Sequence, residues 1–376
     1  MKSIDKYQRY SRQILLREFG KEAQQKLLKA KILVVGAGGL GCPALQYLTA
    51  AGAGTIGVVD YDIVEISNLQ RQPLYGVDDV GKSKATTAVS KLNALNPDIE
   101  IHSFDLKLDN KNALKIISDY EVIIDGSDNY STRYIVNDAC VLLDKPMVYG
   151  AVMRFEGQAG VFNFAGKETS TRINYRDLFP KPPEAGTVFS CNVVGVLGVV
   201  PGLIGTMQAS EAIKIITGIG VVLCNEIMSY NLLTNSFHKF HISHSEEGES
   251  FMPKSQSEFI NYDYEKFCGL KKSENEISAE EFDDLISKER VRIIDVREEK
   301  EILPLNEFKT EHIPISEFEN NILSADLKDT IVMICQTGDR SLKAVEILKQ
   351  KIPGFKAFSL AGGIDAWEKH HKNIKV

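Results

Sequence analysis

The run GAGGLG at residues 36–41 constrains the fold more than any other part of this chain. It follows the apolar segment KILVV and precedes a helical pattern, CPALQYLTAAG. A buried strand, a glycine turn and a helix in that order begin a βαβ unit that binds a nucleotide. Glycines let backbone N–H groups approach a phosphate, and the helix N-terminus attracts its negative charge. The candidate nucleotide contacts in this run are Gly36, Gly38, Gly39 and Gly41.

Strand and helix patterns alternate through the first part of the chain. Further buried strands are predicted at residues 55–60, 99–104, 122–125 and 146–150. Helices between such strands cover both faces of a parallel sheet. Segments 157–164 and 225–241 predict an antiparallel extension of that sheet. The fold class is therefore α/β, with a Rossmann-like nucleotide-binding domain built on a mixed sheet.

The composition changes near Ser243, where HSEEGESFMPKSQSE is polar, charged and poor in aliphatic residues. A second alternation of strands and helices begins near Ile277 and includes VRIIDV, TIVMIC and RSLKAVEILKQK. Polar stretches between such patterns are typical of linkers and exposed loops. We expect a first domain over 1–245, a linker over 246–276 and a smaller α/β domain over 277–376.

The overall composition excludes several classes of protein. A net charge of −7 argues against a general nucleic-acid binder, which needs a basic face. The six cysteines include no CxxC pair, so neither a disulfide framework nor a metal knuckle is expected. No apolar core of signal-peptide length opens the chain, and the most apolar stretch, 195–216, contains Glu211 and Lys214. We expect a cytoplasmic protein that does not enter a membrane.

Polar and cationic residues follow the predicted strands of the first domain. Ligands of open α/β sheets bind at the carboxyl ends of the strands, where these residues would gather. Arg71 and Lys84 are suited to a triphosphate, and Asp128 is suited to Mg²⁺. The other candidates at this edge are Asp60, Asp62 and Asn68. The glycine run alone is equally compatible with a nicotinamide-dependent oxidoreductase, but hydride transfer does not need so many phosphate-directed cations.

Six motifs in order carry a family resemblance. They are RYSRQ, GAGGLG, the Asp60–Asp62 pair, SNLQRQ, Lys84 and DGSDN. The match continues through EGQ at 156–158, SC at 190–191 and GVLGVVPGLIGTMQASEAIK at 195–214. Over residues 5–245 the chain resembles the MoeB/ThiF family, relatives of the ubiquitin-activating enzymes.

The resemblance implies that ATP and Mg²⁺ are used to adenylate the C-terminal glycine of a ubiquitin-like sulfur carrier. By position, the four glycines, Asp60, Asp62 and Asn68 would line the nucleotide, and Arg71 and Lys84 would bind phosphates. Asp128 would serve the metal, Arg12 would reach the phosphates across a dimer interface, and Cys191 would be the catalytic cysteine.

Simpler roles remain open for the same residues. Asn68 and Arg71 can pin a loop, and Arg12 can be a solvated helix residue. Asp128 can cap the following helix, and Cys191 can be a small buried hydrophobe.

Many members of the family hold a structural zinc between two CxxC pairs. The first pair would fall at Asn174 and Asp177, and the second within residues 245–260, which contain no cysteine. Thiolates are the ligands that hold zinc in such sites, so no structural zinc is expected. His238, His241 and His244 follow one another at a spacing of three, which on a strand directs neighbours to opposite faces.

The second domain carries a cysteine at the end of a strand. Cys335 is followed by QTGDRS and a helix, an arrangement in which loop amides can point at the sulfur. The spacing from Cys335 to Arg340 is C-x4-R, one residue shorter than the C-x5-R loop of cysteine phosphatases. The predicted persulfide loop is formed by Gln336, Gly338, Arg340 and Ser341.

This loop, together with IDVRE at 294–298, EHIP at 311–314 and LAGGIDAW at 360–367, resembles a rhodanese over about 277–372. Asp295 and Arg297 are expected to brace the domain. One departure is Glu311, which stands where glycine is usual in the family. A degenerate domain with an inert, buried cysteine is the alternative.

Together the two resemblances predict an activating enzyme fused to a sulfurtransferase. Cys335 would carry a persulfide to the acyl-adenylate, and Cys191 would then release the carrier thiocarboxylate. The expected partners are a carrier ending in Gly-Gly, a sulfur donor such as a cysteine desulfurase and a second copy of the chain. Carriers of molybdopterin synthesis, thiamine synthesis and tRNA thiolation are equally compatible. The rival hypotheses are the oxidoreductase and a non-catalytic scaffold for a ubiquitin-like protein.

Overall fold

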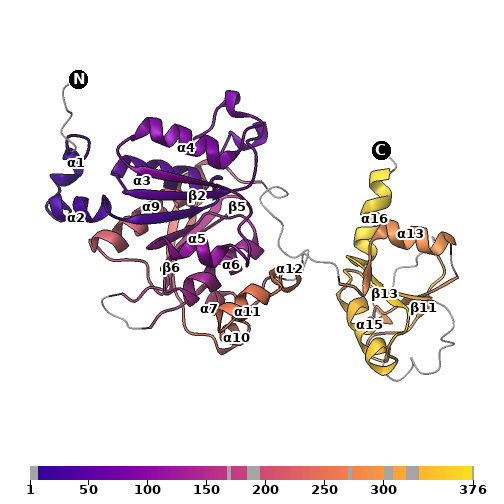
Figure 1. The fold of residues 1–376 in the computed structure, drawn as a ribbon. Helices are drawn as coiled ribbons and strands as arrows, with labels where there is room; N and C mark the ends of the chain where they lie inside the picture. Colours follow the sequence, from indigo (N-terminus) through magenta and orange to yellow (C-terminus); the bar gives the residue numbers. More distant parts are fainter. Residues whose placement is uncertain are drawn as a thin grey trace. The chain divides into compact units, whose positions relative to one another are not determined.

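The computed structural model describes residues 7–166, 171–183, 195–269, 273–288, 290–299, 308–318 and 330–374. The chain divides into two compact units between Cys268 and Gly269 (Figure 1). Each unit has its own sheet and its own buried core. Within the described residues, no helix is both long and apolar enough to cross a membrane.

The first unit is built on an eight-stranded sheet in the order β3-β2-β1-β4-β5-β6-β7-β8. Strands β3 to β5 in that order are parallel, and β6 to β8 are added antiparallel. The strands are β1 Lys31–Val35, β2 Thr55–Asp60, β3 Glu100–Asp105, β4 Val122–Asp125, β5 Met147–Met153, β6 Glu156–Phe162, β7 Glu226–Asn231 and β8 Ser236–His241. The predicted α/β class and its mixed sheet are confirmed.

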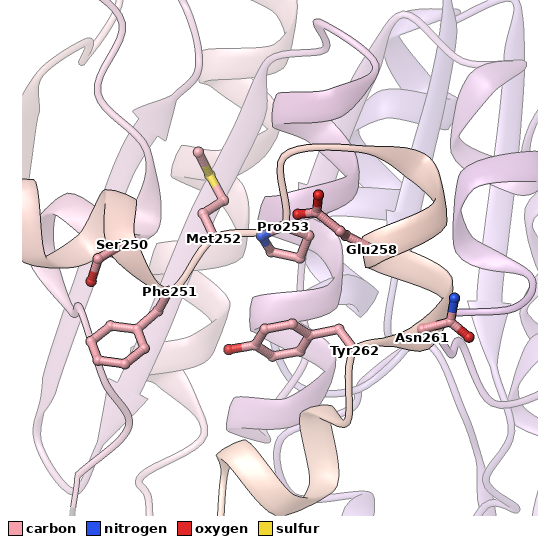
Figure 2. A pocket seen from close by; sticks show the side chains of 7 residues that line it. All are labelled: Ser250, Phe251, Met252, Pro253, Glu258, Asn261 and Tyr262. Atoms are coloured by element: carbon pink, nitrogen blue, oxygen red, sulfur yellow. The ribbon is translucent and has the colours of Figure 1, made fainter.

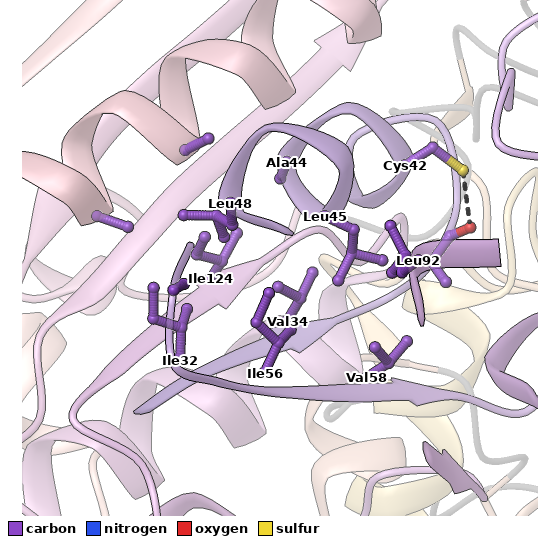
Figure 3. Packing of buried hydrophobic residues seen from close by; sticks show 14 of the residues in the cluster. Ile32, Val34, Cys42, Ala44, Leu45, Leu48, Ile56, Val58, Leu92 and Ile124 are labelled. Carbon is purple, nitrogen blue, oxygen red and sulfur yellow. Dashed lines mark hydrogen bonds between the residues drawn. The ribbon is translucent and has the colours of Figure 1, made fainter. Parts of the chain in front are cut away.

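Helices cover both faces of this sheet (Figure 1). Their bounds are α1 Ser11–Ile14, α2 Gly20–Leu27, α3 Gly41–Ala51, α4 Lys84–Leu95, α5 Ala113–Ser118, α6 Tyr130–Leu142, α7 Tyr175–Leu178 and α9 Val199–Thr217, with the 3₁₀ turns η1 Ile66–Asn68 and η2 Val77–Asp79. Figure 3 shows how Leu45 and Leu48 of α3 pack on the strand residues Val34 and Ile56, with Leu92 of α4 beside them. The central strands β1, β2 and β4 are buried along almost their whole length, as expected for a sheet between two helical layers, whereas the edge strands β3 and β8 are largely exposed.

The stretch after residue 245 differs from the linker expected there. It forms α10 Glu246–Ser250, α11 Gln256–Asn261 and α12 Tyr264–Phe267, and it belongs to the first unit through Cys268. Phe259 and Tyr264 are almost completely buried and join the core that contains α6. Polar residues dominate this segment, so its two buried aromatic side chains did not produce a recognisable apolar period.

The second unit contains a five-stranded parallel sheet in the order β11-β10-β12-β13-β9. Its elements are β9 Glu276–Ile277, α13 Ala279–Lys288, β10 Val291–Asp295, β11 Glu311–His312, β12 Thr330–Ile334, α15 Asp339–Lys351, β13 Ala357–Leu360 and α16 Gly363–Ile374. Helix α15 packs on one face, and Phe282 of α13 and Trp367 of α16 pack on the other. Glu311, the departure noted above, lies in β11 and accepts two hydrogen bonds of 2.6 Å from the Arg292 guanidinium on neighbouring β10.

Candidate functional site

The glycine run forms the turn between β1 and α3. Gly36 has a φ of +92°, and a Cβ on it would lie 2.7 Å from the Gly126 carbonyl oxygen at the end of β4. A Cβ on Gly41 would lie 1.8 Å from the Gly36 carbonyl oxygen. These two glycines are therefore required by close backbone approach. Gly38 and Gly39 have no backbone atom as close and lie between them at the start of the helix.

Asp60, the last residue of β2, holds this turn. Its Oδ2 accepts a hydrogen bond of 2.7 Å from the Ala37 amide, and its Oδ1 accepts one of 2.8 Å from the Asp62 amide. Burial raises the pKa of Asp60 above its ordinary value of 3.8, although both amides and the charge of Lys84 oppose the shift. Each carboxylate oxygen has a second lone pair that can accept from a ribose hydroxyl.

Lys84 is the first residue of α4, and its side chain is only 7% exposed. Its Nζ lies 2.9 Å from Asp62 Oδ2. The Tyr75 hydroxyl lies 2.9 Å from the Ala37 carbonyl oxygen and 3.2 Å from that of Lys84, and it donates to one of them at a time. The structure thus brings the glycine turn, Asp60, Asp62 and Lys84 together. Tyr75 was not predicted from the sequence, because nothing in QPLYG indicates a buried hydroxyl.

Asn68 and Arg71 lie in and just after η1. Asn68 is buried, and its Oδ1 accepts from the Glu65 amide at 3.3 Å. Arg71 is half-buried and donates through a guanidinium nitrogen to the Ser67 carbonyl at 3.0 Å. Both side chains therefore pin their own turn in this structure, as the simpler interpretation proposed. A further residue of the same turn, Gln72, is 3% exposed, and its Oε1 has no hydrogen-bond partner among the residues that the structure describes.

Asp128 lies after β4 and is exposed. The side chain that caps α6 is that of Asn129, which accepts from the Thr132 amide at 2.9 Å. Asp128 is therefore not needed as a cap. The neighbouring Asp125 is fully buried and pairs with Arg133, whose Nε lies 2.8 Å from Asp125 Oδ2.

Arg12 is exposed on α1. Among the described residues, no hydrogen bond or ion pair joins it to the nucleotide turn. The helix is anchored by buried Tyr10, whose hydroxyl accepts from Asn96 Nδ2 at 2.9 Å. Leu15 and Leu16 beside it are 74% and 57% exposed. Cys191 lies outside the described residues, so its role stays a prediction.

The sulfur of Cys335 lies at the end of β12 and is fully buried. The Gly338 amide donates to Sγ at 3.2 Å and the Ser341 amide at 3.4 Å. Gly338 makes this possible with a φ of +98°. Gln336 is directed elsewhere, because its Nε2 donates to Asp365 and its Oε1 accepts from Arg297 at 3.2 Å. Two backbone donors aimed at one sulfur stabilise negative charge on it.

Two buried hydroxyls extend this arrangement. Ser341 Oγ lies 3.4 Å from Cys335 Sγ, and Ser359 Oγ donates to Ser341 Oγ at 2.8 Å. Both serines are completely buried. Ser359 was missed by the sequence analysis, although a serine inside the apolar strand KAFSL was a signal that a partner was required. Arg297 donates through Nε to Asp295 Oδ1 at 3.1 Å and through a terminal guanidinium nitrogen to Oδ2 at 2.7 Å, and both residues are 2% exposed, consistent with a bracing role.

A pocket of about 410 Å³ lies between the end of α10 and α11 (Figure 2). Its lining residues are Ser250, Phe251, Met252, Pro253, Glu258, Asn261 and Tyr262. None of the predicted site residues is among them. Glu258 Oε2 accepts from the Lys254 amide at 2.8 Å, so this carboxylate closes the turn that precedes α11.

The first unit holds a glycine turn with a lysine and two carboxylates at the strand ends, which is typical of a nucleotide site. The second unit holds a cysteine whose sulfur accepts from two amides, which is typical of a sulfur site. Together they define an enzyme with one site of each kind. Residues 10–250 match the ThiF family and residues 278–370 match the rhodanese-like domain, and the chain belongs to the ThiF family. The predicted resemblance is confirmed.

The relatives agree with this assignment. The chain is 41% identical over 378 residues to the probable adenylyltransferase/sulfurtransferase MoeZ of Mycobacterium tuberculosis, covering 98% of this chain and 94% of that protein. It is 46% identical over 267 residues to the sulfur carrier protein adenylyltransferase of Thermus thermophilus, covering 70% and 97%. The crystal structure of E. coli MccB, at 22% identity, shares the fold with a TM-score of 0.55, covering 65% of this chain and 72% of that one. The chain is therefore an ATP-using adenylyltransferase with a sulfurtransferase domain, and neither rival hypothesis is favoured.

Proposed function

We propose that this enzyme adenylates the C-terminal glycine of a ubiquitin-like sulfur carrier and converts it to a thiocarboxylate with sulfur carried by Cys335. The observation that carries the proposal is the presence, in one chain, of the Lys84–Asp62 pair at a glycine turn and of a sulfur held by two amides. The name of the Thermus thermophilus relative supports a sulfur carrier as the substrate.

In the first step a carrier carboxylate oxygen attacks the α-phosphorus of ATP, and pyrophosphate leaves. The nucleophile is already ionised, so no general base is required. Catalysis rests on neutralising charge as the new bond forms. Lys84 is suited to this because Asp62 holds its ammonium group at the carboxyl edge of the sheet before a phosphate arrives. Arg71 can contribute after exchanging the Ser67 carbonyl for a phosphate oxygen.

Asp128 is the residue that would hold Mg²⁺. Its carboxylate is exposed, three residues after the end of β4, and is not used as a helix cap. A bound Mg²⁺ would neutralise phosphate charge, and it typically takes one or two carboxylates, with phosphates and water completing its shell. The absence of a cluster of three or more ligating side chains from the described residues is compatible with such a site.

In the second step the terminal sulfur of a Cys335 persulfide attacks the acyl carbon, and AMP leaves with the bonding electron pair. The product is an acyl disulfide on Cys335. Attack of the Cys191 thiolate on Cys335 Sγ then breaks the S–S bond, releases the carrier thiocarboxylate and forms a Cys191–Cys335 disulfide. A thiol reductant must supply two electrons to reset the enzyme. The Gly338 and Ser341 amides would stabilise charge on Sγ during these exchanges.

The proposed partners complete the scheme. A cysteine desulfurase would supply the persulfide sulfur, and the carrier can be that of molybdopterin synthesis, thiamine synthesis or tRNA thiolation. A second copy of the chain would cover the exposed Leu15 and Leu16 and bring Arg12 to the phosphates of its neighbour.

The test uses the purified chain with ATP, Mg²⁺, a persulfide donor and each purified carrier in turn. We expect carrier-dependent ATP–pyrophosphate exchange and a carrier whose mass shows one oxygen replaced by sulfur. Cys335→Ala should keep the exchange and lose the thiocarboxylate, while Cys224→Ala, a cysteine of the first unit outside both sites, should keep both. Loss of exchange in Cys335→Ala, or thiocarboxylate formation without Cys335, would contradict this division of labour.

A further inference from the structure

The positions expected for the first cysteine pair of a structural zinc lie at the N-cap and within the single turn of the short helix α7. Asn174 precedes this helix and Asp177 lies inside it. Within the segment expected for the second pair, Ser245 and Gly248 stand at the same spacing as a CxxC pair. None of the four supplies a thiolate, which is the usual ligand of structural zinc.

The polar atoms at these positions are already used by one another. Asp177 Oδ2 accepts from the Asn174 amide at 2.8 Å and from its Nδ2 at 2.9 Å. Asp177 Oδ1 accepts from the Ser245 amide at 2.9 Å and lies 3.0 Å from Nδ1 of His244. The Asp177 side chain is only 1% exposed. One buried carboxylate therefore joins two segments that lie 68 residues apart.

The fourth position, Gly248, has no room for a ligating side chain. A Cβ on Gly248 would lie 2.2 Å from the Arg176 carbonyl oxygen. The Gly248 amide donates to Ser245 Oγ at 3.2 Å, which starts α10 directly against α7. The residues present do not fit a tetrahedral zinc site.

The same short helix is fixed on its other side. Arg176, next to Asp177, is fully buried and makes two hydrogen bonds of 2.8 and 2.7 Å to the carboxylate of Asp138 on α6. The Tyr264 hydroxyl on α12 donates to Asp138 at 2.8 Å. Two neighbouring residues of α7 thus tie it to α6, α10 and α12.

We propose that Asp177 is the centre of a metal-free clasp, formed with Asn174, His244 and Ser245, that performs the fastening role of the missing zinc. Hydrogen bonds to a charged acceptor are stronger than neutral ones, and three N–H donors, with the His244 imidazole beside them, compensate for the burial of this carboxylate. The first unit therefore folds and keeps its α7–α10 contact without any metal. This inference is independent of the proposed catalytic scheme.

The first experiment uses the full-length chain, produced in zinc-supplemented medium. Elemental analysis should find no stoichiometric zinc, and 1,10-phenanthroline should leave thermal unfolding unchanged. Hydrogen exchange resolved to peptides should show that the amides of Asn174, Ser245 and Gly248 are protected equally with and without the chelator. One zinc per chain, or protection that the chelator removes, would overturn the proposal.

The second experiment compares Asp177→Asn with Asp98→Asn. Both remove one negative charge, but Asp98 is a half-exposed surface residue 3.7 Å from Arg9. In Asp177→Asn the new side-chain NH₂ group faces N–H groups that donated to the carboxylate, so hydrogen bonds are lost. The first unit should therefore melt at a temperature roughly 4–8 °C lower, and added Zn²⁺ should not restore its melting temperature. The only tryptophan, Trp367, lies in the second unit, so the first unit is followed by calorimetry. Equal melting temperatures of the two variants would refute the clasp. If Asp177→Asn does not fold, the hydrogen-exchange experiment on the unaltered chain provides the test.

Discussion

Lys84 Nζ lies 2.9 Å from Asp62 Oδ2 at the carboxyl end of β2, and the lysine side chain is almost completely buried while the aspartate is half-exposed. An ammonium group held in this way is aligned before the nucleotide binds. The pairing explains how a lysine at the first position of a helix is kept pointing at the ligand edge of the sheet.

We expect Lys84→Met to lower carrier-dependent ATP–pyrophosphate exchange by roughly 100-fold, because it removes a positive charge from the transferring phosphate. Asp62→Asn should have a smaller effect, since it only loosens the alignment of the lysine. Lys82→Met, two residues away and 60% exposed, is the matched control. Equal rates for Lys84→Met and Lys82→Met would exclude this role.

The acid side of nucleotide binding should depend on Asp60. Burial raises the pKa of this carboxyl above 3.8, so protonation begins at a higher pH than for an exposed aspartate. A protonated Asp60 is a weaker hydrogen-bond acceptor for the Ala37 amide and for a ribose hydroxyl. The affinity for ATP should therefore fall as the pH is lowered through the raised pKa of Asp60. Titration calorimetry at decreasing pH measures this. In Asp60→Asn the affinity for ATP should be low at every pH. If that variant still loses affinity at low pH as the wild type does, the pH dependence belongs to another group.

Gly36→Ala should destabilise the first unit and abolish nucleotide binding. The φ of +92° strains any residue with a Cβ, and the added carbon would meet the Gly126 carbonyl at 2.7 Å. Gly20→Ala is the control, because its φ is +62° but nothing lies within 4 Å of the new Cβ. Strain alone costs about 1–2 kcal/mol, so the calorimetric difference between the variants isolates the clash. A Gly36→Ala chain that melts and binds ATP like Gly20→Ala would contradict the geometry.

Ser359→Ala should slow sulfur transfer from the Cys335 persulfide to a small thiol by roughly 3–10-fold. The substitution removes the donor that orients the Ser341 hydroxyl next to the sulfur. Ser341→Ala should slow sulfur transfer further, because it removes the hydroxyl that contacts the Cys335 sulfur. The control is Ser287→Ala on α13, whose exposed hydroxyl donates to the Asp284 carbonyl at 2.7 Å. Unchanged transfer in both buried-serine variants would show that the amides alone are sufficient.

A chain ending at residue 268 should fold as an adenylating unit, whereas one ending at residue 245 should not. The shorter chain loses Phe259 and Tyr264, which lie in the core that contains α6. Loss of one buried aromatic side chain costs about 3–5 kcal/mol, so losing both is comparable to the roughly 5–15 kcal/mol that stabilises a whole domain. Calorimetry and ATP–pyrophosphate exchange on both truncations measure the effect. Equal stability of the two would mean that α11 and α12 are dispensable.

Sequence patterns predicted some parts of the fold better than others. The parallel strands, the antiparallel extension and the second sheet were predictable, because buried strands and amphipathic helices each place apolar residues at a regular spacing in the sequence. Residues 246–268 were not, because Phe259 and Tyr264 are buried by tertiary packing among polar neighbours. The glycine turn at Gly36 and the loop that follows Cys335 were predictable, because each is formed by residues close together in the chain.

The amino-acid sequence on its own determined the family, the nucleotide turn and the cysteine loop, since each depends on residues close together in the chain. It also showed that the expected zinc ligands are missing. Tertiary folding decided the partners: Asp177 meets Ser245 across 68 residues, and Ser359 meets Ser341 across 18. Such hydrogen bonds depend on which buried groups converge in space, and a polar side chain far away in the chain carries no local sign of its partner.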